Sequence, residues 1–179
     1  MGGSGVVCLI ALLAGAAFAQ EATPEPAEKE RTAAAQPALT VGVMELVGLA
    51  SPPPHLGLFV LLSLDVLIPL DDKWSLIPSN GFEMAPDNGN WGGFSFLIVD
   101  RVIGEVGNVV LALEPQVGVV HNAVPRPTGG FDHALYPTVG MGLAMGTGAG
   151  TVIPTTTTSF GLQGEGLSQG FIVYYSVAL

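Results

Sequence analysis

Residues Leu135 to Gly146 read LYPTVGMGLAMG. One side of this stretch is apolar and the other is small or polar; the two sets are Leu135, Val139, Met141, Leu143, Met145 and Tyr136, Thr138, Gly140, Gly142, Ala144, Gly146. Alternation with a period of two is the pattern of a β-strand with two different faces. Strands of globular proteins usually have about 5 to 6 residues, whereas membrane-crossing strands need about 9 to 11. This stretch therefore predicts a strand long enough to cross a membrane.

Two other stretches repeat the pattern. In Leu56 to Leu70 every even position is apolar, whereas the odd positions include Gly57, Ser63 and Asp65. In Asn108 to Val119 the apolar set is Val109, Leu111, Leu113, Val117 and Val119, and Glu114 and Gln116 lie on the other face. These runs are 12 to 15 residues long, which favours a membrane barrel over a soluble sandwich.

Scanning the whole chain for such runs, separated by Gly, Pro, Asn and Asp, predicts eight strands. They are 38–48, 56–70, 73–79, 91–101, 108–122, 133–146, 151–162 and 169–179. Tight links alternate with longer polar ones at 51–55, 80–90, 122–132 and 163–168, as in barrels with short periplasmic turns and longer outer loops. The acidic residues expected in those outer loops are Glu83, Asp87, Asp132 and Glu165.

The N-terminus has the features of an export signal. Val6 to Ala17 form an apolar run of 12 residues, and Ala17-Phe18-Ala19 is a small-x-small cleavage site,. Gln20 to Pro37 is rich in Pro, Ala and Glu and cannot bury a core, so it is expected to be disordered. The predicted organisation is a signal peptide at 1–19, a disordered segment at 20–37 and a β-barrel domain at 38–179.

The composition of the chain indicates which kinds of partner it can bind. The chain carries five basic and 15 acidic residues, a net charge of −10, so it lacks the Lys/Arg clusters that nucleic acid requires. Charged residues are 11% and hydrophobic residues 49%, a composition that favours a lipid-facing surface. Cys8, the only cysteine, lies in the signal, so the mature chain has no thiol for a disulfide or a metal,.

The last strand points to a family. Its outer-face candidates share one side of the strand; they are Phe171, Val173, Tyr175, Val177 and Leu179. This face resembles the C-terminal assembly signal of small bacterial outer-membrane β-barrels, whose members usually end on an aromatic residue, where this chain has Leu179. The resemblance implies an all-β, antiparallel, up-and-down transmembrane barrel of about eight strands. Outer-membrane lipid and the outer-membrane assembly machinery would be its partners, in a Gram-negative bacterium.

Two features concern the inside and the ends of such a barrel. Asp65, Arg101, Glu114 and Gln116 are predicted to form a polar network in the lumen, because buried charges need partners. Aromatic residues near strand ends are expected in an interfacial girdle; they are Trp74, Phe82, Trp91, Phe94, Phe131, Tyr136, Phe171 and Tyr175.

No catalytic, cofactor or metal site is predicted. His121, His133 and Asp132 are residue types used in hydrolysis and metal binding, but no nucleophile motif and no ligand spacing accompanies them,. The expectation is a non-enzymatic protein with a structural, surface-binding or small-solute role. An outer-membrane hydrolase or lipid-modifying enzyme would need one of these histidines to meet a serine and an acid in space.

A second alternative is a secreted or periplasmic soluble β-barrel or sandwich that binds an apolar ligand. Such a protein turns its apolar face inward and shows solvent a polar one. Here the non-apolar face consists of residues such as Gly140, Gly142 and Ala144, which is a poor surface for contact with water.

Overall fold

The computed structural model describes residues 35–48, 55–86, 89–161 and 166–179, with side chains for all of these except 45–48 and 55–57. The predicted signal peptide lies outside the described residues, as does most of the segment expected to be disordered. Within the described residues no helix has the length and hydropathy to cross a membrane.

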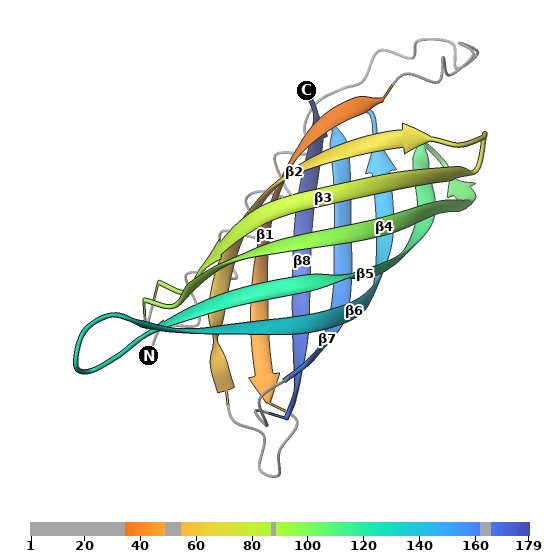
Figure 1. The fold of residues 1–179 in the computed structure, drawn as a ribbon. Helices are drawn as coiled ribbons and strands as arrows, with labels where there is room; N and C mark the ends of the chain where they lie inside the picture. Colours follow the sequence, from red (N-terminus) through yellow and green to blue (C-terminus); the bar gives the residue numbers. More distant parts are fainter. Residues whose placement is uncertain (1–34, 49–54, 87–88, 162–165) are drawn as a thin grey trace.

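Eight strands form one closed barrel in which each strand pairs with its sequence neighbours and β8 pairs with β1 (Figure 1). Every pairing is antiparallel, so the barrel is of the up-and-down type. The fold predicted from the sequence is therefore confirmed. The strands are β1 (Gln36–Gly48), β2 (His55–Pro69), β3 (Trp74–Met84), β4 (Trp91–Val106), β5 (Val109–Pro125), β6 (Phe131–Thr147), β7 (Gly150–Phe160) and β8 (Leu167–Ala178).

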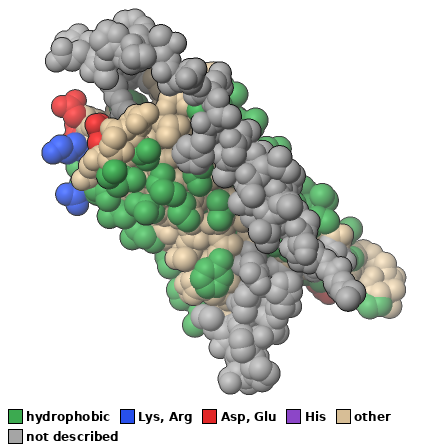
Figure 2. Space-filling model, turned by 180° about the vertical axis from the view of Figure 1, so that it is seen from behind, with side chains coloured by type: hydrophobic (Ala, Val, Ile, Leu, Met, Phe, Trp, Pro, Cys, Tyr) green, Lys and Arg blue, Asp and Glu red, His purple; other side chains and the backbone are tan. Residues whose placement is uncertain are grey.

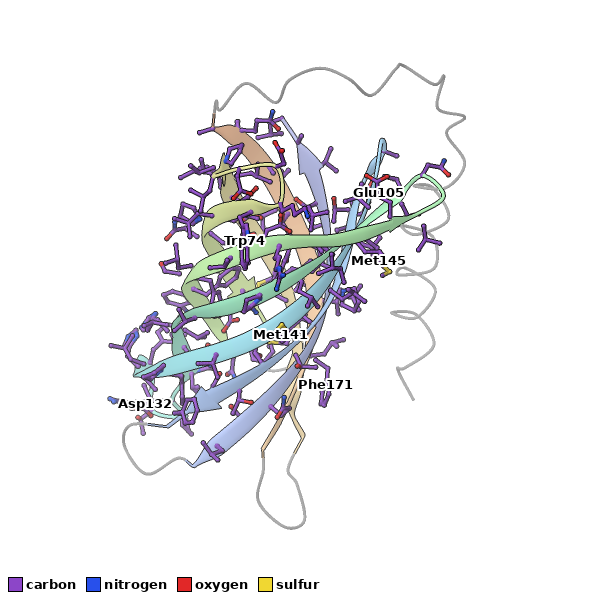
Figure 3. All side chains as sticks on the ribbon, turned by 90° about the vertical axis from the view of Figure 1, so that its right-hand side faces the viewer. Trp74, Glu105, Asp132, Met141, Met145 and Phe171 are labelled. Carbon is purple, nitrogen blue, oxygen red and sulfur yellow. The ribbon has the colours of Figure 1, made fainter. Side chains whose placement is uncertain are left out.

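Alternation sorts the side chains into two environments. On β2, Ser63 and Asp65 are buried in the barrel, while Leu62 and Leu64 are exposed on its outside. The face predicted to be wholly apolar is thus the outer face. Figure 2 shows hydrophobic side chains over the visible wall, with blue and red ones gathered mainly at one end. In Figure 3, Met141 of β6 lies along the wall, and Glu105 and Asp132 lie toward opposite ends of the barrel.

Large side chains fill much of the interior. A hydrophobic cluster that includes Phe59, Phe94, Phe96 and Tyr174 lies inside the barrel. Phe94, expected in the interfacial girdle, is therefore a core residue, because it shares its strand face with Phe96. Packing of this kind requires small residues on the neighbouring strand, where the rings approach the backbone.

One departure from the predicted strands is at β3, which continues to Met84 instead of ending at Ser79. Asn80 and Gly81 are turn-forming residue types, but here they pair with β2 on one side and β4 on the other. Closure of the barrel gives their backbone groups partners on both edges, which outweighs local turn preference. As a consequence Glu83, expected in an outer loop, is inside the barrel and 1% exposed.

Other strand ends also differ from the predicted bounds. β1 begins at Gln36, two residues before the expected Ala38, and β4 runs on to Val106 through a register shift between Val102 and Gly104. The turn between β2 and β3 is closed by Asp71, whose Oδ1 accepts hydrogen bonds from the backbone N–H groups of Lys73 and Trp74, at 2.8 and 2.9 Å.

Candidate functional site

A small polar cavity lies inside the barrel. Its volume is about 20 Å³, which is room for about one water molecule. Hydroxyl, carboxyl and amide groups share its wall with apolar side chains; the lining residues are Thr40, Ser63, Asp65, Ser79, Phe94, Phe96, Ile98, Glu114, Gln116, Ile153, Thr155 and Tyr174. The lining comes from seven strands, because every strand turns alternate residues inward.

The polar groups of this cavity are incompletely paired. The Thr40 hydroxyl donates a short hydrogen bond to Oδ2 of Asp65, but Oδ1 of Asp65 and Nε2 of Gln116 have no hydrogen-bond partner. Asp65 and Gln116 are each 8% exposed, and Glu114 is 7% exposed. Buried polar groups left unpaired in this way cost folding free energy.

No cationic side chain among the described residues reaches the cluster. Lys73, Arg101 and Arg126 are all exposed, and the Arg101 guanidinium lies 4.9 Å from the ring centre of Trp74. Of the four residues predicted to form a lumen network, the structure brings together Asp65, Glu114 and Gln116 around one cavity and places Arg101 elsewhere. The parity of β4 explains this, since its buried positions are even-numbered.

A third buried carboxyl lies toward the loop end of the barrel. Oε1 of Glu83 and Oδ1 of Asn122 both lack hydrogen-bond partners, and both face the backbone of Gly92. A Cβ atom on Gly92 would lie 2.7 Å from the Asn122 oxygen and 3.1 Å from the Glu83 oxygen. Sequence reasoning missed this pair because it read Asn80 to Asn90 as a loop.

Two histidines meet on the outer face, near the loop that joins β5 and β6. Nε2 of His121 and Nδ1 of His133 are 3.1 Å apart, beside the rings of Trp91 and Phe131. Among the described hydrogen bonds, none joins either histidine to a serine, so the serine that a hydrolytic site would need is not seen there. Asp132 instead pairs with Arg126, whose Nε donates to Oδ1 at 2.6 Å.

The proposed assembly signal lies on the outer face of β8. Phe171, Val173 and Val177 are exposed, as is the terminal Leu179, whose backbone N–H bonds to the carbonyl oxygen of Pro37. Tyr175 is half-buried because its hydroxyl donates to the backbone oxygen of Ala149 at 3.0 Å. All five residues therefore lie on the side of β8 that faces away from the lumen.

Comparison with solved structures finds small barrels. The N-terminal β-barrel domain of Pseudomonas aeruginosa OprF is 16% identical, with a TM-score of 0.47 over 80% of this chain and 100% of that one. Ail, the attachment invasion locus protein of Yersinia pestis, is 11% identical, with a TM-score of 0.49 over 80% of this chain and 97% of that one. Ail in complex with the heparin analogue sucrose octasulfate is also 11% identical, with a TM-score of 0.45 over 80% and 99%.

No protein-family model matches the chain, and no curated protein matches it in sequence. At these identities and TM-scores, the strand pairing within the chain itself remains the evidence for its fold.

Proposed function

We propose that the chain is a barrel of the bacterial outer membrane, with its outer wall in contact with lipid. The supporting observation is that apolar side chains lie outside and polar ones inside, the reverse of their distribution in soluble proteins. Val60, Leu62 and Leu64 of β2 are 48%, 49% and 53% exposed, while Ser63 and Asp65 between and beside them are buried. An apolar outside around a partly polar inside suits lipid and is unfavourable in water.

The ends of the wall support the same proposal. Near the loop ends of their strands, the ring centre of Trp91 lies 6.3 Å from that of Phe82 and 5.8 Å from that of Phe131. Trp74 stands near the turn at the other end, with Arg101 over its ring. Aromatic rings at both edges of an apolar band are the girdles that bilayer interfaces favour.

Within the membrane the proposed role is structural or surface-binding, not catalytic and not that of an open pore. Phe59, Phe94, Phe96 and Tyr174 pack inside the barrel, where a solute path would have to run. A filled barrel is a rigid scaffold that holds its connecting loops at the membrane surface.

Localisation is tested by expressing the full chain in a Gram-negative host and separating its membranes. We expect the protein in the outer-membrane fraction, with faster gel migration before boiling than after it. Recovery as a soluble periplasmic or secreted protein would refute the proposal and would direct attention to the apolar-ligand alternative.

The closed interior is tested by planar-bilayer conductance of the purified barrel. We expect no steady single-channel current. The double variant Phe96→Ala/Tyr174→Ala, which removes two of the rings, is the matched comparison and should conduct more than the unaltered chain. A steady current from the unaltered chain would favour the small-solute role instead.

A further inference from the structure

We propose that His121 and His133 form a binding site for a first-row transition-metal ion of the kind that prefers imidazole, such as Cu²⁺, Ni²⁺ or Zn²⁺. The site does not depend on where the barrel resides, because it is built from one hairpin. Imidazole nitrogen is a common protein ligand for these ions.

The spacing of the two nitrogens fits a shared ion. Nε2 of His121 and Nδ1 of His133 are 3.1 Å apart. Metal–imidazole bonds of about 2.0 to 2.1 Å place two nitrogens on one ion about 2.9 Å apart at a right angle and about 3.4 Å apart at a tetrahedral angle. The observed distance falls between these values. Each ring must turn by roughly 35 to 45° to direct its nitrogen lone pair at a shared ion, because in the edge-to-edge contact the two lone-pair axes point along the line between the nitrogens.

The ring arrangement shows what the ion would replace. The ring planes are within 9° of parallel and the ring centres are 5.2 Å apart, farther than the two nitrogens, so the rings meet edge to edge. One ring must then donate an N–H to the bare nitrogen of the other. A metal ion takes the place of that shared proton, which moves through solvent to the other nitrogen of the donor ring, and both facing nitrogens then donate a lone pair to the ion.

The backbone holds both histidines in position. β5 and β6 are paired without a register shift from Val110 and Gly146 to Pro125 and Phe131, with His121 opposite Leu135 and His133 opposite Ala123. The histidines are therefore diagonal neighbours on one face, a separation that long side chains on adjacent strands can bridge.

The surroundings set the character of the site. The ring centre of Trp91 lies 6.2 Å from that of His121 and 6.4 Å from that of His133, in both cases edge-on. The described residues contain no group of three or more His, Cys, Asp or Glu side chains suited to a metal. The protein thus supplies two ligands, and water or an external donor completes the coordination, as in sites that keep open positions.

Trp91 also provides the readout. In a Trp74→Phe variant it is the only tryptophan of the chain, and bound Cu²⁺ should quench its emission. We would titrate the folded mature barrel, prepared without a polyhistidine tag, and expect quenching that saturates at one ion per chain. Zn²⁺, which does not quench, should displace Cu²⁺ and restore the emission.

Matched variants separate the site from general metal adsorption. In the Trp74→Phe background, His121→Gln and His133→Gln should each weaken binding by at least about tenfold. His55→Gln, which removes the third histidine, should leave binding unchanged. In a Trp91→Phe barrel the remaining Trp74, on the opposite end of the wall, should not be quenched at the same Cu²⁺ concentration.

All variants would first be checked for folding by their gel migration before and after boiling. Equal Cu²⁺ affinity in the folded His121→Gln/His133→Gln double variant and the unaltered site would overturn the proposal. Equal quenching of Trp74 and Trp91 would do so as well. If the double variant does not fold, the displacement of Cu²⁺ by Zn²⁺ is measured in the His121→Gln variant. A displacement curve equal to that of the unaltered site would overturn the proposal.

Discussion

The ring of Phe94 occupies the space that a side chain at Gly81 would need. A Cβ atom at this position would be 2.3 Å from Cζ of Phe94 and 2.6 Å from the backbone oxygen of Leu62. The backbone oxygen cannot move without disturbing β2, and the ring is enclosed in the core. Phe94 on β4 and Gly81 on β3 face each other in register, so the glycine and the ring form one packing unit.

We predict that Gly81→Ala lowers the free energy of unfolding by about 1 to 3 kcal/mol, because the added methyl overpacks this unit. Urea unfolding in detergent or lipid vesicles measures the change. Gly93→Ala is the control, since a Cβ there would meet only the Gly81 oxygen, at an ordinary 3.4 Å. Equal effects of the two substitutions would contradict the packing argument.

A second residue-scale prediction concerns Glu114, buried among the described residues without a cationic side chain nearby. Replacing it by Gln keeps the shape and removes the charge that burial disfavours. We expect Glu114→Gln to raise the free energy of unfolding by about 1 kcal/mol or more. Glu105→Gln, at an exposed site at the barrel end, should change stability by no more than about 0.5 kcal/mol. A loss of stability in Glu114→Gln would show that this carboxyl makes favourable interactions in the lumen.

At the scale of the element, strand number and facing were predictable because each strand carries its own alternation. The end of β3 was not predictable, because Gly81 makes room for the ring of Phe94 on β4. The sequence of one strand does not show which residues of the next strand will lie against it. Arg101 was placed in the lumen wrongly because the inward face of β4 carries Phe94 and Phe96, so apolar character does not distinguish the two faces of this strand. The contact of His121 with His133 depends on the register of β5 against β6, which neither strand encodes alone.

The outward face of β6 yields a prediction about insertion. Met141 is exposed on the wall, far from the strand ends, so we expect Met141→Lys to destabilise the membrane-inserted barrel by about 2 to 4 kcal/mol. Val106→Lys, at the turn end of β4, should cost about 0 to 1 kcal/mol. The folded fraction on unboiled gels after refolding into vesicles measures both, and a harmless Met141→Lys would argue against a lipid-facing β6.

The end of β8 allows the proposed assembly signal to be separated from stability. Leu179 is exposed and is tied to the barrel by its backbone N–H. We therefore expect Leu179→Asp to lower the amount of folded barrel in cells, while refolding of the purified protein in detergent is unchanged. If folding falls equally in both settings, or in neither, Leu179 is not part of a recognition signal.

For the whole molecule, two arrangements are combined in one barrel. The wall is apolar outside, with Trp74 near one end and Trp91 near the other, and the interior holds the cluster of Asp65, Glu114 and Gln116 beside a hydrophobic core. A soluble barrel would require the opposite distribution of polar groups. The proposed function therefore depends on whether lipid or water surrounds the outer wall.

The most direct test places a reporter in the middle of the wall. A Trp74→Phe/Trp91→Phe/Met141→Trp barrel has a single tryptophan on the outer face of β6, and it would be reconstituted in vesicles whose lipids carry bromine at known depths. Contact with lipid predicts the strongest quenching by bromines near the bilayer centre and little quenching by aqueous iodide. Efficient quenching by iodide, with none by brominated lipid, would contradict the membrane-embedded barrel.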